Sequence, residues 1–170
     1  MLSDRFFIHG IVRLFCSVII VCLISSCANL TSMEKSIDTL TSEANEGDLN
    51  AAHALCFRFS NGVGAEIDDD AAFNWCHRAS STQNPKSMTL LADLYYHGRG
   101  TEQDYHQAAK LYYFAAQRGI DKAMLMLYHH YINGYGVAKD ETEARYYLNR
   151  AAQRNYAPAK QLKQQLLLQP

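Results

Sequence analysis

The chain has 170 residues, with 16 Lys and Arg against 17 Asp and Glu, which gives a formal net charge of −1. This balance lacks the excess of positive charge with which proteins attract nucleic acids, so we expect no nucleic-acid partner. The length that remains after removal of an N-terminal leader fits a single domain.

The N-terminal segment has the three-part plan of a secretory signal. Arg5 and Arg13 supply positive charge, residues 14–24 form an apolar run, and two small residues follow. At about 1.5 Å per residue, this run is too short to cross a hydrocarbon core of about 30 Å as a helix. We therefore predict a cleaved lipoprotein-type signal peptide over residues 1–26.

Residues 24–27 resemble the lipobox of bacterial lipoproteins, in which an aliphatic residue and two small ones precede a cysteine. The resemblance implies that Cys27 carries a thioether-linked diacylglycerol and an acylated amino terminus, which together anchor the chain stably in a membrane. Ala28 stands where aspartate retains such proteins in the inner membrane, so the resemblance implies the outer membrane, with the protein facing the periplasm. Residues 27–32 would then be a lipidated tether. The alternative is an ordinary cleaved signal whose cysteine is incidental.

The rest of the chain repeats with a period of 36 residues. Glycines, leucines, aspartates and alanines recur in the same register, and a period of this length indicates a solenoid. The recurring positions include Gly62, Gly98 and Gly134; Gly64, Gly100 and Gly136; Leu55, Leu91 and Leu127; Asp68, Asp104 and Asp140; and Ala72, Ala108 and Ala144.

Each repeat is predicted to contain two helices. The first has apolar residues at i, i+3 and i+4 and ends at a glycine, which readily adopts the positive φ of a helix C-terminus. The second begins after an aspartate, a strong N-cap residue. The first helices are predicted over residues 49–60, 86–97 and 121–132, and the second helices after Asp68, Asp104 and Asp140. Single helices over 33–46 and 158–167 would close the array, the latter with a polar outer face.

The repeated residues resemble the Sel-one-like repeat (SLR) family, relatives of the tetratricopeptide repeat, over about residues 44–155. The best match runs from Ala92 through the turn at Gly98 and Gly100 to Gly119. The resemblance implies an all-α fold: a right-handed α-solenoid of about three 36-residue helical hairpins, with half-repeat caps at both ends, over residues 33–170. It also implies a protein-binding module and not an enzyme.

Cys56 and Cys76 remain as an even pair once Cys27 is acylated. Cys56 lies six residues before Gly62 and Cys76 twelve after Gly64, which places them at a similar height on neighbouring antiparallel helices. An oxidising periplasm permits a disulfide, which needs Cα atoms about 4.4–6.8 Å apart. The alternative is that both cysteines are small hydrophobic side chains that fill the core.

We predict no catalytic residue, metal site or cofactor. Ser32 and Lys35 match the Ser-x-x-Lys motif of serine β-lactamases, but neither Ser-Asp-Asn nor Lys-Thr-Gly follows it. The histidines lack metal-ligand spacing, and the adjacent His129 and His130 would point about 100° apart on a helix.

In tetratricopeptide-like arrays the first helices line the concave side, where this sequence places aromatic, histidine and aspartate side chains at i, i+4 and i+7. We expect this concave stripe to hold an extended peptide or a helix of another envelope protein. The alternative is that some of these side chains pack against the next repeat. The stripe consists of His53, Phe57, Asp93, Tyr96, His97, His129 and Ile132.

The expected function is a membrane-anchored protein–protein interaction scaffold, adaptor or regulator in the bacterial cell envelope. Two alternatives stay open. One is an envelope enzyme, such as a cell-wall or β-lactam hydrolase, and the other is a structural accessory subunit of a secretion or envelope complex.

Overall fold

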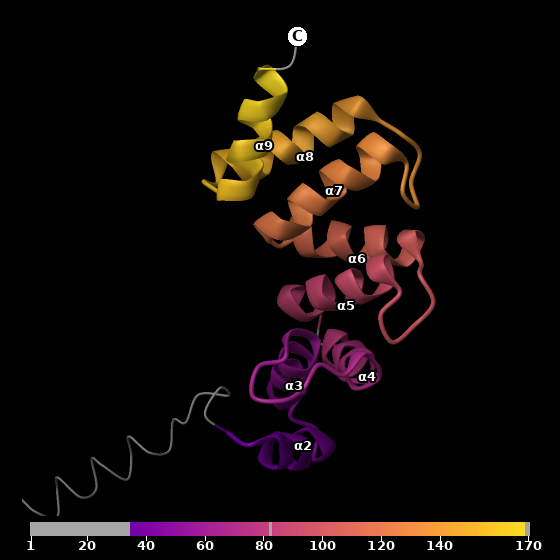
Figure 1. Cartoon of the computed structure of the whole chain (residues 1–170), viewed down its shortest axis with the longest axis vertical. Helices are drawn as coiled ribbons and strands as arrows, with labels where there is room; N and C mark the ends of the chain where they lie inside the picture. The colour runs from indigo at the N-terminus through magenta and orange to yellow at the C-terminus, as the bar shows by residue number, and fades with distance from the viewer. Residues whose placement is uncertain (1–34, 82, 169–170) are drawn as a thin grey trace, which may run out of the picture. The chain divides into compact units, whose positions relative to one another are not determined.

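The structure is a computed structural model that describes residues 35–81 and 83–168. The predicted signal peptide over 1–26, the lipidation site Cys27 and the tether over 27–32 lie outside the described residues. Within the described ranges every helix or strand is an α-helix, in the order α2 to α9 (Figure 1). None of these described helices combines the length and the apolar character that a membrane span requires.

The first helix of each repeat ends at a glycine in the left-handed conformation. These helices are α3 (Leu49–Asn61), α5 (Pro85–His97) and α7 (Asp121–Asn133). The backbone φ is 70° at Gly62, 65° at Gly98 and 76° at Gly134, a region that is costly for residues with a Cβ atom. Each glycine N–H donates to the carbonyl four residues earlier, which satisfies an acceptor at the helix end.

An aspartate begins the second helix of each repeat. These helices are α4 (Asp69–Ser80), α6 (Tyr105–Gln117) and α8 (Glu141–Gln153). The Asp68 side chain accepts a hydrogen bond from the backbone N–H of Ala71, and Asp104 and Asp140 each accept two from the turn that follows. These bonds satisfy donors that the helix itself leaves unpaired, so the predicted N-caps are confirmed.

A single helix lies at each end of the three hairpins: α2 (Ile37–Asn45) and α9 (Ala157–Leu167). The predicted range of the leading helix was too long, because residues 35 and 36 precede α2. Pro158 lies in the first turn of α9, where its missing N–H leaves no hydrogen bond unmade. The closing face is less polar than predicted, since Leu167 on α9 is 77% exposed.

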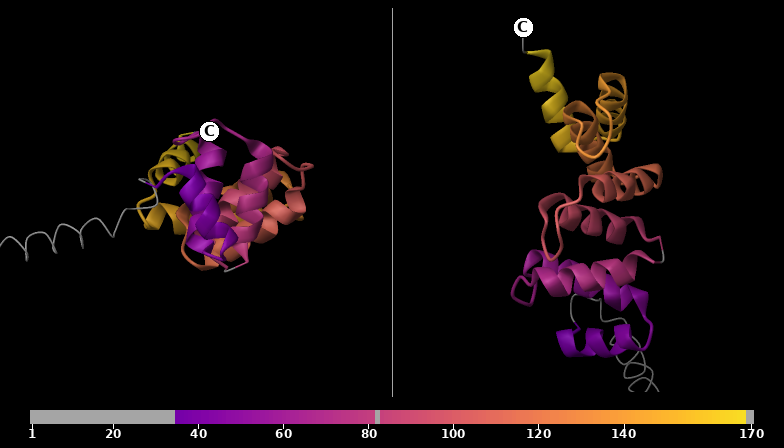
Figure 2. Two further views of the ribbon diagram at one scale, coloured as in Figure 1. Left: turned by 90° about the horizontal axis from the view of Figure 1, so that it is seen from below. Right: turned by 90° about the vertical axis from the view of Figure 1, so that its right-hand side faces the viewer.

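Consecutive helices pack against each other in layers, as two directions of view show (Figures 1 and 2). Alanines at recurring positions let the helices approach closely, and they are fully buried. These residues are Ala72, Ala108, Ala144, Ala79, Ala115 and Ala151. The arrangement confirms the predicted all-α solenoid of three helical hairpins with a single helix at each end.

The second glycine of each later Gly-x-Gly turn lies against the preceding repeat. A Cβ atom on Gly100 would overlap the backbone of Asp69, and one on Gly136 would overlap the backbone of Tyr105. Gly64 has no complete repeat before it, and its Cβ would only approach the flexible Arg58 guanidinium, at 3.0 Å. The later turns therefore rest on the first turn of the previous second helix, which sets the spacing between repeats.

Candidate functional site

One groove is built from the first helices of all three repeats. Its volume is about 330 Å³, and residues of α3, α5 and the start of α7 line it. The lining combines an aromatic ring, aliphatic side chains and charged groups. We call it the α3–α5–α7 groove, lined by His53, Phe57, Lys86, Thr89, Leu90, Asp93, Ile120 and Lys122.

Asp93, which lines the groove from α5, connects this helix to α6 and α7. The Tyr112 hydroxyl of α6 donates to Asp93 Oδ1 at 2.6 Å, and Lys122 Nζ of α7 donates to Asp93 Oδ2 at 2.6 Å. Burial, followed by the negative charge of Asp93, raises the pKa of Tyr112 well above its ordinary value, so this hydroxyl remains a donor. The carboxylate is therefore held in one orientation.

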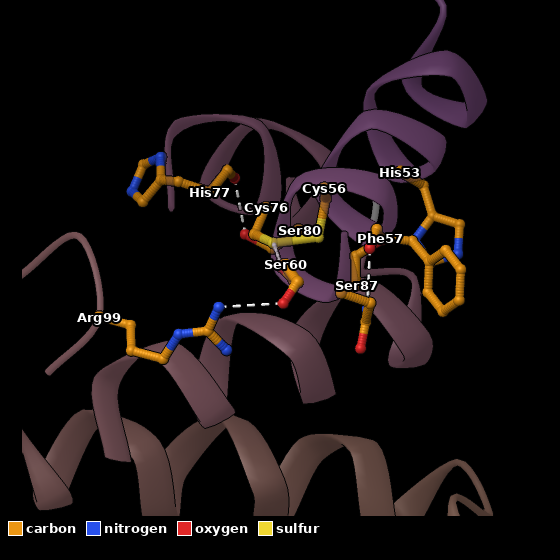
Figure 3. The surroundings of a disulfide bond; sticks show 10 residues. His53, Cys56, Phe57, Ser60, Cys76, His77, Ser80, Ser87 and Arg99 are labelled. Carbon is orange, nitrogen blue, oxygen red and sulfur yellow. Dashed lines mark hydrogen bonds between the residues drawn. A yellow bond between two sulfur atoms is a disulfide. The ribbon is translucent and has the colours of Figure 1, made fainter. Parts of the chain in front are cut away.

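His53 and Phe57 lie on successive turns of α3, as Figure 3 shows, and both line the groove. His53 Nδ1 lies 2.9 Å from the hydroxyl of Ser87, which is fully buried. Burial, and then the nearby charge of Lys86, lower the pKa of His53, so its imidazole is neutral at pH 7. Phe57 is 37% exposed, which leaves its side chain available for contact.

The structure brings together only part of the predicted stripe: His53, Phe57 and Asp93 share the α3–α5–α7 groove. Tyr96, by contrast, packs between the second and third repeats. Its ring centre lies 5.2 Å from that of Tyr105 and 5.4 Å from that of His130. Tyr96 thus follows the alternative reading, in which a stripe residue packs against the next repeat.

The remaining three stripe residues lie apart from the groove. His97 is exposed, with its ring 4.9 Å from that of Tyr96, and His129 is half-buried, 5.0 Å from the Tyr128 ring. Ile132 borders a different hollow of about 420 Å³, which residues of α7, α8 and α9 line. The predicted stripe is therefore divided in space.

His130 forms the buried centre of the aromatic packing between the second and third repeats. Its Nδ1 lies 2.6 Å from the carbonyl oxygen of Tyr135, so Nδ1–H donates to that oxygen. Burial lowers the pKa of His130, which keeps the ring neutral at pH 7. The tyrosine rings in contact with it belong to Tyr96, Tyr105, Tyr112 and Tyr135.

A disulfide joins Cys56 on α3 to Cys76 on α4 (Figure 3). Their Cα atoms lie 4.7 Å apart, and both side chains are fully buried. The Ser60 hydroxyl lies 3.8 Å from the Cys76 sulfur. Of the two arrangements that the sequence leaves open, the structure contains the bonded one, which closes the first hairpin.

Five groove residues lie outside the predicted stripe: Lys86, Thr89, Leu90, Ile120 and Lys122. A signal for the lysines was present, because Lys86 and Lys122 are 36 residues apart and occupy the same position of successive repeats. A comparison of charged residues at positions 36 apart, in addition to aromatic and histidine residues, would have placed both lysines on the same side of the array.

The groove contains groups suited to recognition by charge and apolar contact. In the described part of the chain, no three His, Cys, Asp or Glu side chains gather as a metal ion would need. Ser32, the nucleophile of the Ser-x-x-Lys match, lies outside the described residues.

The profile of the Sel1 repeat family matches residues 49–81, 85–120 and 122–156. Each matched segment corresponds to one helical hairpin: α3 with α4, α5 with α6, and α7 with α8. No match is found among curated proteins.

Several solved structures share the fold. A Sel1 repeat protein from Oxalobacter formigenes is 35% identical over 75% of this chain and 96% of that chain, with a TM-score of 0.64. A protective antigen of uropathogenic Escherichia coli with an SLR fold is 24% identical over 72% of this chain but 26% of its own length, with a TM-score of 0.68. The cysteine rich protein B of Helicobacter pylori is 20% identical over 79% of this chain and 98% of its own, with a TM-score of 0.58.

Proposed function

Since the chain belongs to the Sel1 repeat family, we propose that it is a lipid-anchored adaptor of the bacterial cell envelope, which binds a segment of another protein in the α3–α5–α7 groove. The Sel1 repeat fold is typical of protein–protein interaction scaffolds. Its function therefore has to be argued from the surface that the repeats build.

The α3–α5–α7 groove is the observation that carries this proposal. Three helices from three repeats contribute to it, and the exposed Phe57 ring offers an aromatic anchor of the kind that dominates protein interfaces. Asp93 is fixed by two hydrogen bonds, so little further ordering is needed when a partner arrives.

The envelope location in the proposal is supported by the N-terminal sequence. Positive charge, a short apolar run and a lipobox-like ending at Cys27 fit a lipoprotein signal. The buried Cys56–Cys76 disulfide is compatible with an oxidising compartment such as the periplasm.

Site-specific photo-crosslinking in living cells tests the groove. A photoreactive amino acid replaces Phe57, and in a matched control it replaces Tyr146 on α8, which is an exposed aromatic residue outside the groove. We expect a discrete crosslinked partner from position 57 and none from position 146. Equal crosslinking from both positions, or from neither, would contradict the proposed site.

Membrane fractionation of the full chain tests the anchor. Cys27→Ala removes the acylated thiol, so the protein should move from the membrane fraction to the soluble fraction. Wild-type protein should contain diacylglycerol on Cys27 by mass spectrometry. An unmodified wild-type cysteine would contradict the lipid-anchor part of the proposal and leave the groove untouched.

Co-purification and activity measurements separate the two alternative functions from the proposed one. A permanent accessory subunit would co-purify with its complex without crosslinking, whereas an adaptor would lose its partner on dilution. An envelope hydrolase would show turnover of cell-wall or β-lactam substrates that disappears when Ser32 or Lys35 is replaced.

A further inference from the structure

We propose that the α3–α5–α7 groove selects partner segments in which an aspartate or glutamate side chain lies next to a large apolar side chain. This inference rests on the proposed function, because it names the chemistry of the segment that the groove would hold. Two lysines at the same repeat position, together with apolar surface in the same groove, carry the inference.

The lining of the groove has an unbalanced positive charge. Lys122 and Asp93 form an ion pair at 2.6 Å, and Asp93 also accepts from Tyr112, so the charges of this pair offset each other. Lys86 is exposed and has no ion-pair partner among the described residues. With His53 neutral, Lys86 and Lys122 against Asp93 leave one net positive charge in the lining. An incoming carboxylate would balance it.

Lys86 lines the groove together with His53, and its charge, after burial, contributes to the lowered pKa of that imidazole. Lys122 donates one N–H to Asp93, and an ammonium group has three donors. Both lysines can therefore donate to a carboxylate of a bound segment while Asp93 keeps its present partners.

A carboxylate alone would contribute little binding free energy, so the partner segment must also cover the apolar surface of the groove. An exposed ion pair contributes only about 0–1 kcal/mol, whereas buried apolar surface contributes about 25 cal/mol per Å². Phe57 is 37% exposed, and Leu90 and Ile120 are half-buried, so a large side chain can cover all three. A segment that offers both features uses both parts of the groove.

Peptide selection on the purified full-length protein tests this inference. Random peptides are displayed at internal positions, and the selected sequences are synthesised with both ends blocked. We expect Asp or Glu beside Leu, Ile or Phe in these peptides. Affinity is measured by fluorescence anisotropy, and added salt should weaken binding because it screens the lysines.

Lysine variants provide the matched comparison. Lys86→Gln should weaken peptide binding about twofold to fivefold, and Lys86→Arg should retain most of it. Lys139→Gln, which changes an exposed lysine between α7 and α8 outside the groove, should leave binding unchanged.

Four results would overturn the inference. They are selected peptides without acidic residues, acidic peptides that bind Lys86→Gln as tightly as wild type, loss of binding once both peptide ends are blocked, and self-association lost in Lys86→Gln, which analytical ultracentrifugation would detect. The last result would show that a second copy of the chain occupies the groove.

Phe57→Ala separates this inference from the proposed function. If Phe57→Ala abolishes peptide binding while Lys86→Gln does not, the groove is a binding site but does not select for acidic segments. If Phe57→Ala also leaves binding unchanged, and position 57 captures no partner in cells, the proposed site itself is wrong.

Discussion

The junction between the first and second repeats differs chemically from the junction between the second and third, although in both a turn glycine lies against the first residue of the preceding second helix. Arg99, in the middle of its Gly-x-Gly turn, pairs with Asp69 at 2.5 Å on the preceding second helix. One period later these positions hold Tyr135 and Tyr105, whose rings stack with centres 4.8 Å apart. An ion pair and an aromatic stack thus occupy one place in the repeat.

A similar exchange occurs inside the hairpins. The first hairpin is joined by the Cys56–Cys76 disulfide, and the positions one period later are Ala92 and Tyr112. Both of these side chains are fully buried. The two helices of a hairpin can therefore be held at this spacing either by a disulfide or by a small side chain packed against a large one.

This comparison indicates that the glycine turns and buried alanines set the spacing of helices and repeats. The residues between them determine whether an ion pair, a disulfide or aromatic packing stabilises that spacing. At these equivalent positions, the N-terminal side has an ion pair and a disulfide, and the C-terminal side has aromatic rings. The two sides should therefore respond differently to mutation, reductant and salt.

The largest effect is expected from the aromatic side. Tyr112→Ala should lower the free energy of unfolding by about 4 kcal/mol, because it leaves a cavity in the core of the second hairpin. Tyr112→Phe should cost about 1 kcal/mol, since it removes only the hydrogen bond to Asp93. Urea unfolding followed by circular dichroism measures both. Equal losses in the two variants would contradict the packing role of the ring.

Removing the disulfide should have the next largest effect. The combined change Cys56→Ala and Cys76→Ala should cost about 3 kcal/mol, because the bond spans 20 residues and restricts the unfolded chain. Thermal unfolding with and without dithiothreitol provides the measurement. Reductant should lower the wild-type midpoint and leave the variant unchanged. Complete alkylation of both thiols in non-reduced protein would show that the bond is absent.

The second glycines of the turns in the first and second repeats should differ by about 2 kcal/mol in the cost of an alanine substitution. Gly100→Ala should cost about 3 kcal/mol, from the positive φ and the overlap with the Asp69 backbone. Gly64→Ala should cost about 1 kcal/mol, because the flexible Arg58 side chain can move aside. Chemical unfolding of the two variants in parallel gives the difference. Equal costs would mean that the later turns do not rest on the preceding repeat.

The smallest effect concerns salt. Arg99→Gln should cost at most about 1 kcal/mol, because both partners are partly exposed, and the loss should shrink at about 1 M salt. Tyr135→Leu should lose stability to the same extent at low and high salt, since ring stacking does not depend on net charge. Denaturation curves at two salt concentrations test this contrast. A stability loss in Arg99→Gln that is the same at both salt concentrations would contradict it.

Most of the fold could be predicted because the repeat combines strong local signals with a fixed spacing. A glycine at positive φ ends each first helix, and an aspartate caps each second helix, so both bounds are set by neighbouring residues. The start of α2 was less predictable, because no repeated anchor precedes Ile37 in the chain.

The candidate site was only partly predictable, because side-chain neighbours across repeats do not follow from position on one helix. Tyr96 shares the stripe register with His53 and Phe57, yet its ring packs against Tyr105 and Tyr135, which come from other parts of the repeats. Ile120 reaches the groove from the turn before α7, which a helix-face argument does not include.

The disulfide has a mechanical consequence for a chain held at its N-terminal side. Tension from that side would peel α2 away and then unravel α3 as far as Cys56. From there the load would pass through the sulfur atoms to Cys76, so the loop between them would carry no force. Phe57 is the first residue inside this shielded loop. We therefore expect the segment that contains Phe57, the proposed aromatic anchor, not to be extended when the end of the array is stretched.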